Sequence, residues 1–535
     1  MNKTKLTHRF VRGLHLFVIA ALLAAAALGL APAPVAQGGG PVHQESGPPL
    51  PGEPPQTPEP LPPDLKGPEV LGPWRLERSK IRKPRHLKRA EVPESRHPRR
   101  PELPDLREAL PQLPPAAALT TVAATAACNV PSGAYPTIAA ALADPSCDPI
   151  NVAAGTYTEN LAVSRSVTIQ GAGQGMTTID GNAVDSVFVI YPGVVVTLAD
   201  MTITNGQATD GGGILNEGTL TLNRSTVSDN QAIELLFDSG GGGIFNDHGT
   251  LTLNNSTISD NLAESNVCGY GGGIENWAGT LTLNGTTVSG NLAEGDLCGY
   301  GGGIDNDEGT VTLNDSTVSG NQATSDSVSY GGGIENWAGT LTLTDSTVSG
   351  NRATYTSNPA GALCLSGGVD NEDGTVTLTN STVSDNQATG CDENWGGGIS
   401  NETYEVDGVA TMTLTNSIVS GNQATGGEEN YGGGINNEAY EVGSVATMTL
   451  TNSTVSGNQA TGGDYTWDGG ISNDGGATLT LTDSTVSGNQ ATGGYYSNAG
   501  GGIGNYDGTV MLINSTVSGN QATGGEDNWG GGRCC

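Results

Sequence analysis

Acidic residues recur at fixed positions along this 535-residue chain. They stand one and three positions after a repeated aliphatic residue, and the clearest examples are Glu275, Asp305, Asp307, Asp370 and Glu372. Oxygen ligands repeated along a rigid face suit Ca²⁺, so these five residues are candidate metal ligands with calcium as the candidate cofactor. The alternative is a solvated acidic stripe that keeps neighbouring molecules apart.

The same carboxylates also allow a catalytic interpretation. Asp305 with Asp307, or Asp370 with Glu372, would lie two strand residues apart, about 7 Å, which is within the carboxylate separation of inverting glycosidases. Lyase chemistry on an acidic polysaccharide needs a basic group, and residues 116 to 535 carry only four Arg, at unrelated positions of the repeat, and no Lys. We therefore favour a non-enzymatic role and keep a polysaccharide lyase or glycoside hydrolase as the alternative.

Aromatic residues form a second column, four positions before the aliphatic residue. Its members are Tyr270, Tyr300, Tyr330, Trp395, Tyr431 and Trp467, and Trp277 and Trp337 join them from the acidic stripe. Flat rings beside Gly-rich turns can stack on sugar rings while their polar tips reach hydroxyl groups, which predicts a glycan-binding face. The alternative is a structural ladder in which the rings cover the glycine turns and pack on each other.

These columns arise from a sequence repeat that begins at Gly211. Its aliphatic residues are Ile214, Ile244, Ile274, Ile304, Ile334, Val369, Ile399, Ile435, Ile471 and Ile503, at spacings of 30 to 36 residues. Within a unit apolar and polar residues alternate, as in Leu281, Thr282 and Leu283, which indicates strands rather than helices. A period of this length is typical of a solenoid, here with three short strands in each of roughly 13 coils.

Stacked coils turn each repeated position into a ladder. Ile274, Leu281, Leu283 and Val288 are predicted to point inward, and the Asn columns that include Asn276 and Asn291 are predicted to form amide ladders. Stacking would also bring Cys268 within disulfide range of Cys298.

The cysteine pattern gives two further candidate pairs. Cys128 lies near Cys147 at the N-terminal end of the repeats, and Cys364 and Cys391 fall on adjacent coils. Three disulfides would fit an exported, oxidising setting, and free buried thiols are the alternative.

The repeat units resemble those of a known class of surface protein. The Gly-Gly-Gly-Ile-x-Asn units are similar to those of right-handed parallel β-helix proteins, including the Gly-Gly-Ala-Ile and Asn repeats of chlamydial polymorphic outer-membrane proteins. The stretch from Tyr135 to Gly173 resembles the opening of the pectin-lyase-like superfamily. The resemblance implies an all-β, right-handed, single-stranded parallel β-helix with a short N-terminal capping helix, but no particular activity, since the fold carries lyases, hydrolases, adhesins and passive scaffolds.

Composition divides the chain into four parts. Residues 1–36 have the pattern of a signal peptide, and residues 37–115 form a Pro-rich, basic linker that is expected to be disordered. Residues 116–149 are expected to form the N-terminal cap, and residues 150–535 the repeats. The acidic repeats argue against nucleic acid as a partner.

We expect a secreted or cell-surface scaffold or adhesin that binds a polysaccharide or another cell-envelope polymer multivalently, with no membrane insertion of the mature chain.

Overall fold

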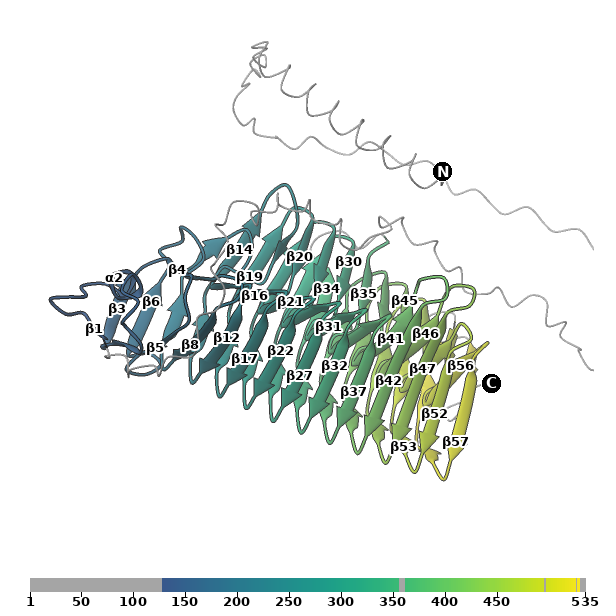
Figure 1. Ribbon diagram of the computed structural model, residues 1–535. Helices are drawn as coiled ribbons and strands as arrows, with labels where there is room; N and C mark the ends of the chain where they lie inside the picture. Colours follow the sequence, from purple (N-terminus) through teal and green to yellow (C-terminus); the bar gives the residue numbers. More distant parts are fainter. Residues whose placement is uncertain (1–127, 356–360, 495–496, 526, 530–535) are drawn as a thin grey trace, which may run out of the picture. The chain divides into compact units, whose positions relative to one another are not determined.

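Short parallel strands stacked on one another form the framework of the described chain. The computed structural model describes residues 128–355, 361–494, 497–525 and 527–529. The predicted signal peptide and Pro-rich linker lie outside these residues. The described residues form a right-handed parallel β-helix whose coils follow one another in sequence order (Figure 1). Among them, no helix is long and apolar enough to cross a membrane.

Five parallel sheets run along the stack. Sheet A has 14 strands, from β1 (Cys128–Val130) to β57 (Thr509–Ile513), and sheet B has 13, from β3 (Gly155–Thr158) to β58 (Thr516–Ser518). Sheet C has 12 strands, from β4 (Leu161–Val163) to β56 (Ile503–Tyr506). Sheet D has 11, from β10 (Gln207–Ala208) to β59 (Gln521–Thr523), and sheet E has 10, from β15 (Ser239–Gly240) to β60 (Asp527–Trp529).

One complete coil shows the order of the sheets. It contains β21 (Ile274–Trp277) in sheet C, β22 (Thr280–Asn284) in sheet A, β23 (Thr287–Ser289) in sheet B, β24 (Leu292–Gly295) in sheet D and β25 (Cys298–Tyr300) in sheet E. The expectation of three strands in each coil was therefore too low. Sheets D and E were missed because their strands have only two to four residues, too few to show apolar alternation.

The main core lies between sheets A, B and C. Ile274, Leu281, Leu283 and Val288 are fully buried, as predicted, and equivalent residues continue this core from Cys128 to Ile503. Adjacent coils pair in register, for example Ile274 with Ile304 and Leu283 with Leu313. The period of the sequence is therefore the period of the core.

Polar side chains fix the register at the corners of each coil. At the corner of sheets C and A, the amide of Asn276 donates to Oδ1 of Asn306 at 2.7 Å and to the carbonyl of Gly279 at 3.1 Å. At the corner of sheets B and D, the amide of Asn291 donates to Oδ1 of Asn321 at 2.9 Å. Both predicted Asn ladders are confirmed, and since these buried amides are satisfied only when the coils align, they oppose slippage between coils.

A short helix closes the N-terminal end of the described chain. Helix α2 (Ile138–Leu142) is capped by Thr137, whose hydroxyl accepts from the amide of Ala140, and Glu159 accepts from the amides of Ile138 and Ala139. Arg165 donates to the carbonyl of Leu142, the last residue of the helix, and to that of Cys147 beyond it. The predicted capping helix is confirmed, and Arg165 has a structural role in holding it.

The three predicted disulfides are present. They join Cys128 to Cys147, Cys268 to Cys298 and Cys364 to Cys391, with Cα–Cα distances of 5.3, 4.5 and 5.6 Å. The first ties the end of the capping segment to β1, and the other two link successive coils in the region of sheets D and E.

Candidate functional site

A second core covers the outer face of sheet C. A side chain at Gly240, which aligns with Tyr270 in sheet E, would collide with the carboxylate of Glu275 in sheet C. The side chains of sheet E therefore point onto the acidic column of sheet C. This second core consists of Cys268, Tyr270, Cys298, Tyr300, Val328, Tyr330, Leu365, Trp395 and Tyr431.

The acidic column is buried and is not a solvated stripe. The exposed fraction of the residue is 7% for Glu275, 2% for Asp305 and Asp307, 0% for Asp370 and 3% for Glu372. Alternation along the strand does place these residues on the outer side of the main core, as predicted. The solvated setting expected for them was wrong, because sheet E lies over that side.

The buried carboxylates do not form a recognisable metal centre. Within the described residues, no three or more His, Cys, Asp or Glu side chains gather in an arrangement that could hold a metal ion. The calcium site at Glu275, Asp305, Asp307, Asp370 and Glu372 therefore stays a prediction.

The aromatic column is a ladder. The ring centroids of Tyr270 and Tyr300 are 5.1 Å apart with the planes 8° from parallel, and those of Tyr300 and Tyr330 are also 5.1 Å apart. Trp395 and Tyr431 continue the column with centroids 5.4 Å apart in an edge-to-face contact.

These five rings are at most 9% exposed, so they offer no face to a sugar. The glycan-binding role expected for Tyr270, Tyr300, Tyr330, Trp395 and Tyr431 is corrected here to packing. Trp467, which is half-buried and stacks on Tyr431 at 6.2 Å, ends the described ladder.

Burial changes the acidity of two carboxyl groups beside the second core, those of Glu438 and Glu393. Loss of hydration, followed by the charge of Asp474, raises the pKa of Glu438 from 4.5 to about 8, although Tyr440 donates a hydrogen bond to this carboxylate at 2.8 Å. Burial and the neighbouring Glu429 raise the pKa of Glu393 to about 7. Carboxylic acids in this region therefore hold protons at a pH where an exposed Glu is ionised.

Two tryptophans remain partly accessible at the edge of sheet C. Trp277 is aligned with Asp307, and Asp307 is aligned with Trp337 in the next coil, so the two indoles stand two coils apart in one column. Both are half-buried. Ladder spacing places them roughly 10 Å apart. The exposed residues Ala278 and Ala338 follow the two indoles in sequence, and the exposed Glu308 follows Asp307 in the coil between them.

The surroundings of Trp277 hold its ring in place. Its indole lies 6.4 Å from the ring of Phe245 with the planes 9° from parallel, and the ring of His248 meets it edge-on at 5.1 Å. Of the eight predicted ligand-binding residues, Trp277 and Trp337 are the pair that is partly accessible and aligned in one column.

Sequence reasoning missed two tyrosines that cover the later coils. Tyr404 and Tyr440 stack with centroids 4.3 Å apart, and Tyr440 also stacks on Trp395 at 5.7 Å. Both follow strands of sheet C, β41 (Ile399–Thr403) and β46 (Ile435–Ala439). The signal for them was present, because the spacing of the repeat lengthens to 36 residues in these two coils.

Comparison with known proteins gave no family assignment. No family model matches the sequence, and no curated protein matches it. Similar solved structures include the catalytic domain of GH87 alpha-1,3-glucanase in complex with nigerose, with a TM-score of 0.36 and 12% identity over 77% of this chain and 70% of that chain.

The catalytic domain of GH87 alpha-1,3-glucanase in complex with tetrasaccharides gives a TM-score of 0.36 and 14% identity over the same shares of the two chains. A likeness at this level assigns no activity, and the fold described above rests on the strand pairing of the chain itself.

Proposed function

We propose that this chain is an exported, non-enzymatic β-helix that binds polysaccharide at the edge of sheet C. The observation that carries the proposal is the pair Trp277 and Trp337, which are half-buried and two coils apart in one column. Export is supported by the apolar N-terminal segment and by three disulfides.

The spacing of the two indoles suits an extended glycan. Rings roughly 10 Å apart along a stack are separated by about the length of a disaccharide unit in an extended chain, so two sugars of one strand could each lie on an indole. The exposed Glu308 lies beside this path and offers acceptors for hydroxyl groups. Each contact is weak, and affinity would come from engaging both rings on a rigid support.

Replacing both indoles tests the proposal. The double variant Trp277→Ala/Trp337→Ala should bind a soluble polysaccharide at least tenfold more weakly, because each stacked ring contributes about 1 kcal/mol. The measurement is retardation in affinity electrophoresis through gels that contain α-1,3-glucan, a β-glucan or xylan. Trp277→Phe/Trp337→Phe keeps flat rings and should retain most of the binding.

Thr287→Ala, on the outer face of sheet B, is the matched control for surface truncation. Unchanged retardation of the double Ala variant, with a melting temperature equal to that of the parent, would contradict the proposal. So would the absence of retardation of the parent protein by every polymer in the panel.

A glycoside hydrolase is the second candidate function. It is favoured by the acidic groups of the second core, where Asp370 and Glu372 stand two residues apart in β36 (Val369–Glu372) and Glu438 is protonated near neutral pH. Glycoside hydrolysis needs two carboxyl groups, one of which acts as a protonated acid. The burial of all three groups opposes it, since no sugar reaches them without movement of the covering rings.

We therefore expect no release of reducing ends when the protein is incubated with the same polysaccharides, and no unsaturated products of a lyase. Release that disappears in Asp370→Asn or Glu372→Gln would establish the hydrolase instead. The same two variants should leave binding at Trp277 and Trp337 unaltered, which separates the two functions.

A further inference from the structure

The outer face of sheet A is a regular grid of threonines. Five consecutive strands each present three outward Thr residues: β32 (Thr340–Thr344), β37 (Thr375–Thr379), β42 (Val409–Thr415), β47 (Val445–Thr451) and β52 (Thr478–Thr482). The residues of the central column are Thr342, Thr377, Thr413, Thr449 and Thr480, each paired with the next in register. The four preceding strands, from β12 (Thr219–Asn223) to β27 (Thr310–Asn314), keep two Thr columns and carry Asn in the third.

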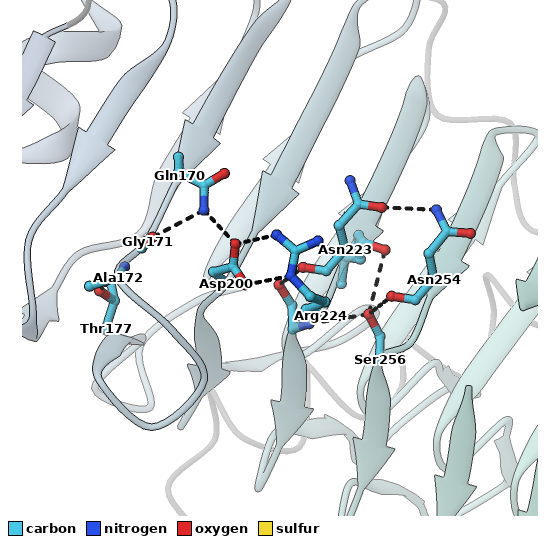
Figure 2. Close-up of polar contacts among 11 residues, drawn as sticks. Gln170, Gly171, Ala172, Thr177, Asp200, Asn223, Arg224, Asn254 and Ser256 are labelled. Carbon is cyan, nitrogen blue, oxygen red and sulfur yellow. Dashed lines mark hydrogen bonds and ion pairs between the residues drawn. The ribbon is translucent and has the colours of Figure 1, made fainter. Parts of the chain in front are cut away.

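This grid carries no charge in a strongly acidic chain. The sequence holds 55 acidic residues, yet none of the outward positions of the nine strands from β12 to β52 is acidic or basic. The charged groups nearest the N-terminal end of the face lie at its corner and pair with each other. Figure 2 shows the guanidinium of Arg224 on the carboxylate of Asp200, beside Gln170 and the Asn223 and Asn254 amides.

The hydroxyl groups of the grid are available to an outside partner. Within the described residues, the hydroxyls of the central column make no hydrogen bond to protein, and the side chains are half-buried by their neighbours in the ladder. Thr is stiff about its first side-chain torsion, so each position presents one methyl and one hydroxyl group in a defined direction. At the corners of each coil, the Asn276 and Asn291 ladders hold successive coils in register.

The grid therefore has two fixed spacings. Neighbouring strands lie about 4.8 Å apart, and alternate residues along a strand lie about 6.7 Å apart. The oxygen atoms on a prism face of hexagonal ice repeat at similar distances in two perpendicular directions. We propose that the outer face of sheet A binds ice, by ordering water between its methyl and hydroxyl groups into positions that join the crystal lattice.

Ice fits this face better than the other partners considered. A glycan site would be expected to offer aromatic platforms, and the outward positions from β12 to β52 hold none. A protein interface would be enriched in aromatic, Met and Arg side chains at its centre, which are also absent from these positions. What the face does offer is the same side chains repeated in register over nine strands, which matters only for a partner that is itself periodic.

Ice binding is independent of the polysaccharide site, because it uses another face, and it can be measured separately. Purified protein should show thermal hysteresis, shape single ice crystals and slow recrystallisation in a frozen sucrose film. Thr377→Lys/Thr413→Lys places two long charged side chains at the centre of the grid and should remove more than half of the hysteresis. Thr382→Lys lies on sheet B in the same coil as Thr377 and should retain it.

The proposal is overturned if the parent protein shows neither hysteresis nor crystal shaping, or if the sheet A and sheet B variants lose activity equally. A parent protein without ice activity, together with sheet A variants that lose retardation by polysaccharide, would identify the face as a glycan surface instead. Trp277→Ala/Trp337→Ala should keep full ice activity. Equal melting temperatures of all variants would show that each is folded.

Discussion

Gly302→Ala is expected to lower the free energy of unfolding by about 3 kcal/mol or more. A Cβ atom at Gly302 would lie 2.4 Å from the carbonyl carbon and oxygen of Gln322 and 2.5 Å from the carbonyl oxygen of Gly332. All three atoms belong to backbone, so no side chain can turn away. The coils would have to separate where the glycine turn meets sheet D.

The measurement is urea-induced unfolding followed by circular dichroism. Because each coil contacts only its neighbours, a break at Gly302 should also weaken the coupling between the two halves of the stack and make the transition biphasic. Gly320→Ala is the matched control, since Gly320 has a positive φ of 64° but open space around its Cβ position. It should cost about 1 kcal/mol, and equal losses in the two variants would show that contact with sheet D is not the cause.

Raising the pH is expected to destabilise the protein by a few kcal/mol, because the folded state holds a proton on Glu438. The pKa of this carboxyl group is about 8 in the fold and 4.5 as its ordinary value. The stabilisation is therefore complete below pH 4.5, declines as the pH rises toward 8 and is lost above that. Glu393, with a pKa of about 7, contributes with the same sign.

Urea unfolding at pH 5, 7 and 9 measures this dependence. Glu438→Gln has no proton to lose and should reduce the difference in stability between pH 5 and pH 9, while Glu405→Gln, at an exposed position, should leave it as in the parent. A Glu438→Gln variant whose stability falls with pH as steeply as that of the parent would refute the assignment.

The fold could be predicted from the sequence because the repeat makes each aligned position a physical ladder. Ile274, Asn276, Asn291 and the Cys268–Cys298 pair are each predicted correctly by aligning one coil with the next. No property of a single coil was needed beyond the alternation of its apolar residues.

The candidate site could be predicted only in part, because alternation gives the side of a strand and not what lies over that side. Glu275 and Asp305 do point away from the main core, but sheet E returns over them and makes that side a second interior. The return depends on strands of mostly three residues, which are too short to show apolar alternation in the sequence. Trp277 and Trp337 stay accessible because their coils have no residue like Tyr404 or Tyr440, which cover the later coils; each Trp is followed by an Ala.

The direction of the buried Asn ladders gives the stack a polarity. In both ladders the side-chain amide of one coil donates to the oxygen of the coil that follows it in the chain, as Asn276 does to Asn306 and Asn291 to Asn321. A growing chain therefore leaves, at its newest edge, donors that only the next segment can satisfy. The coils can therefore fold in sequence order, starting from the disulfide-bonded N-terminal end. Each new coil pairs with the coil before it, which suppresses pairing with distant copies of the same repeat.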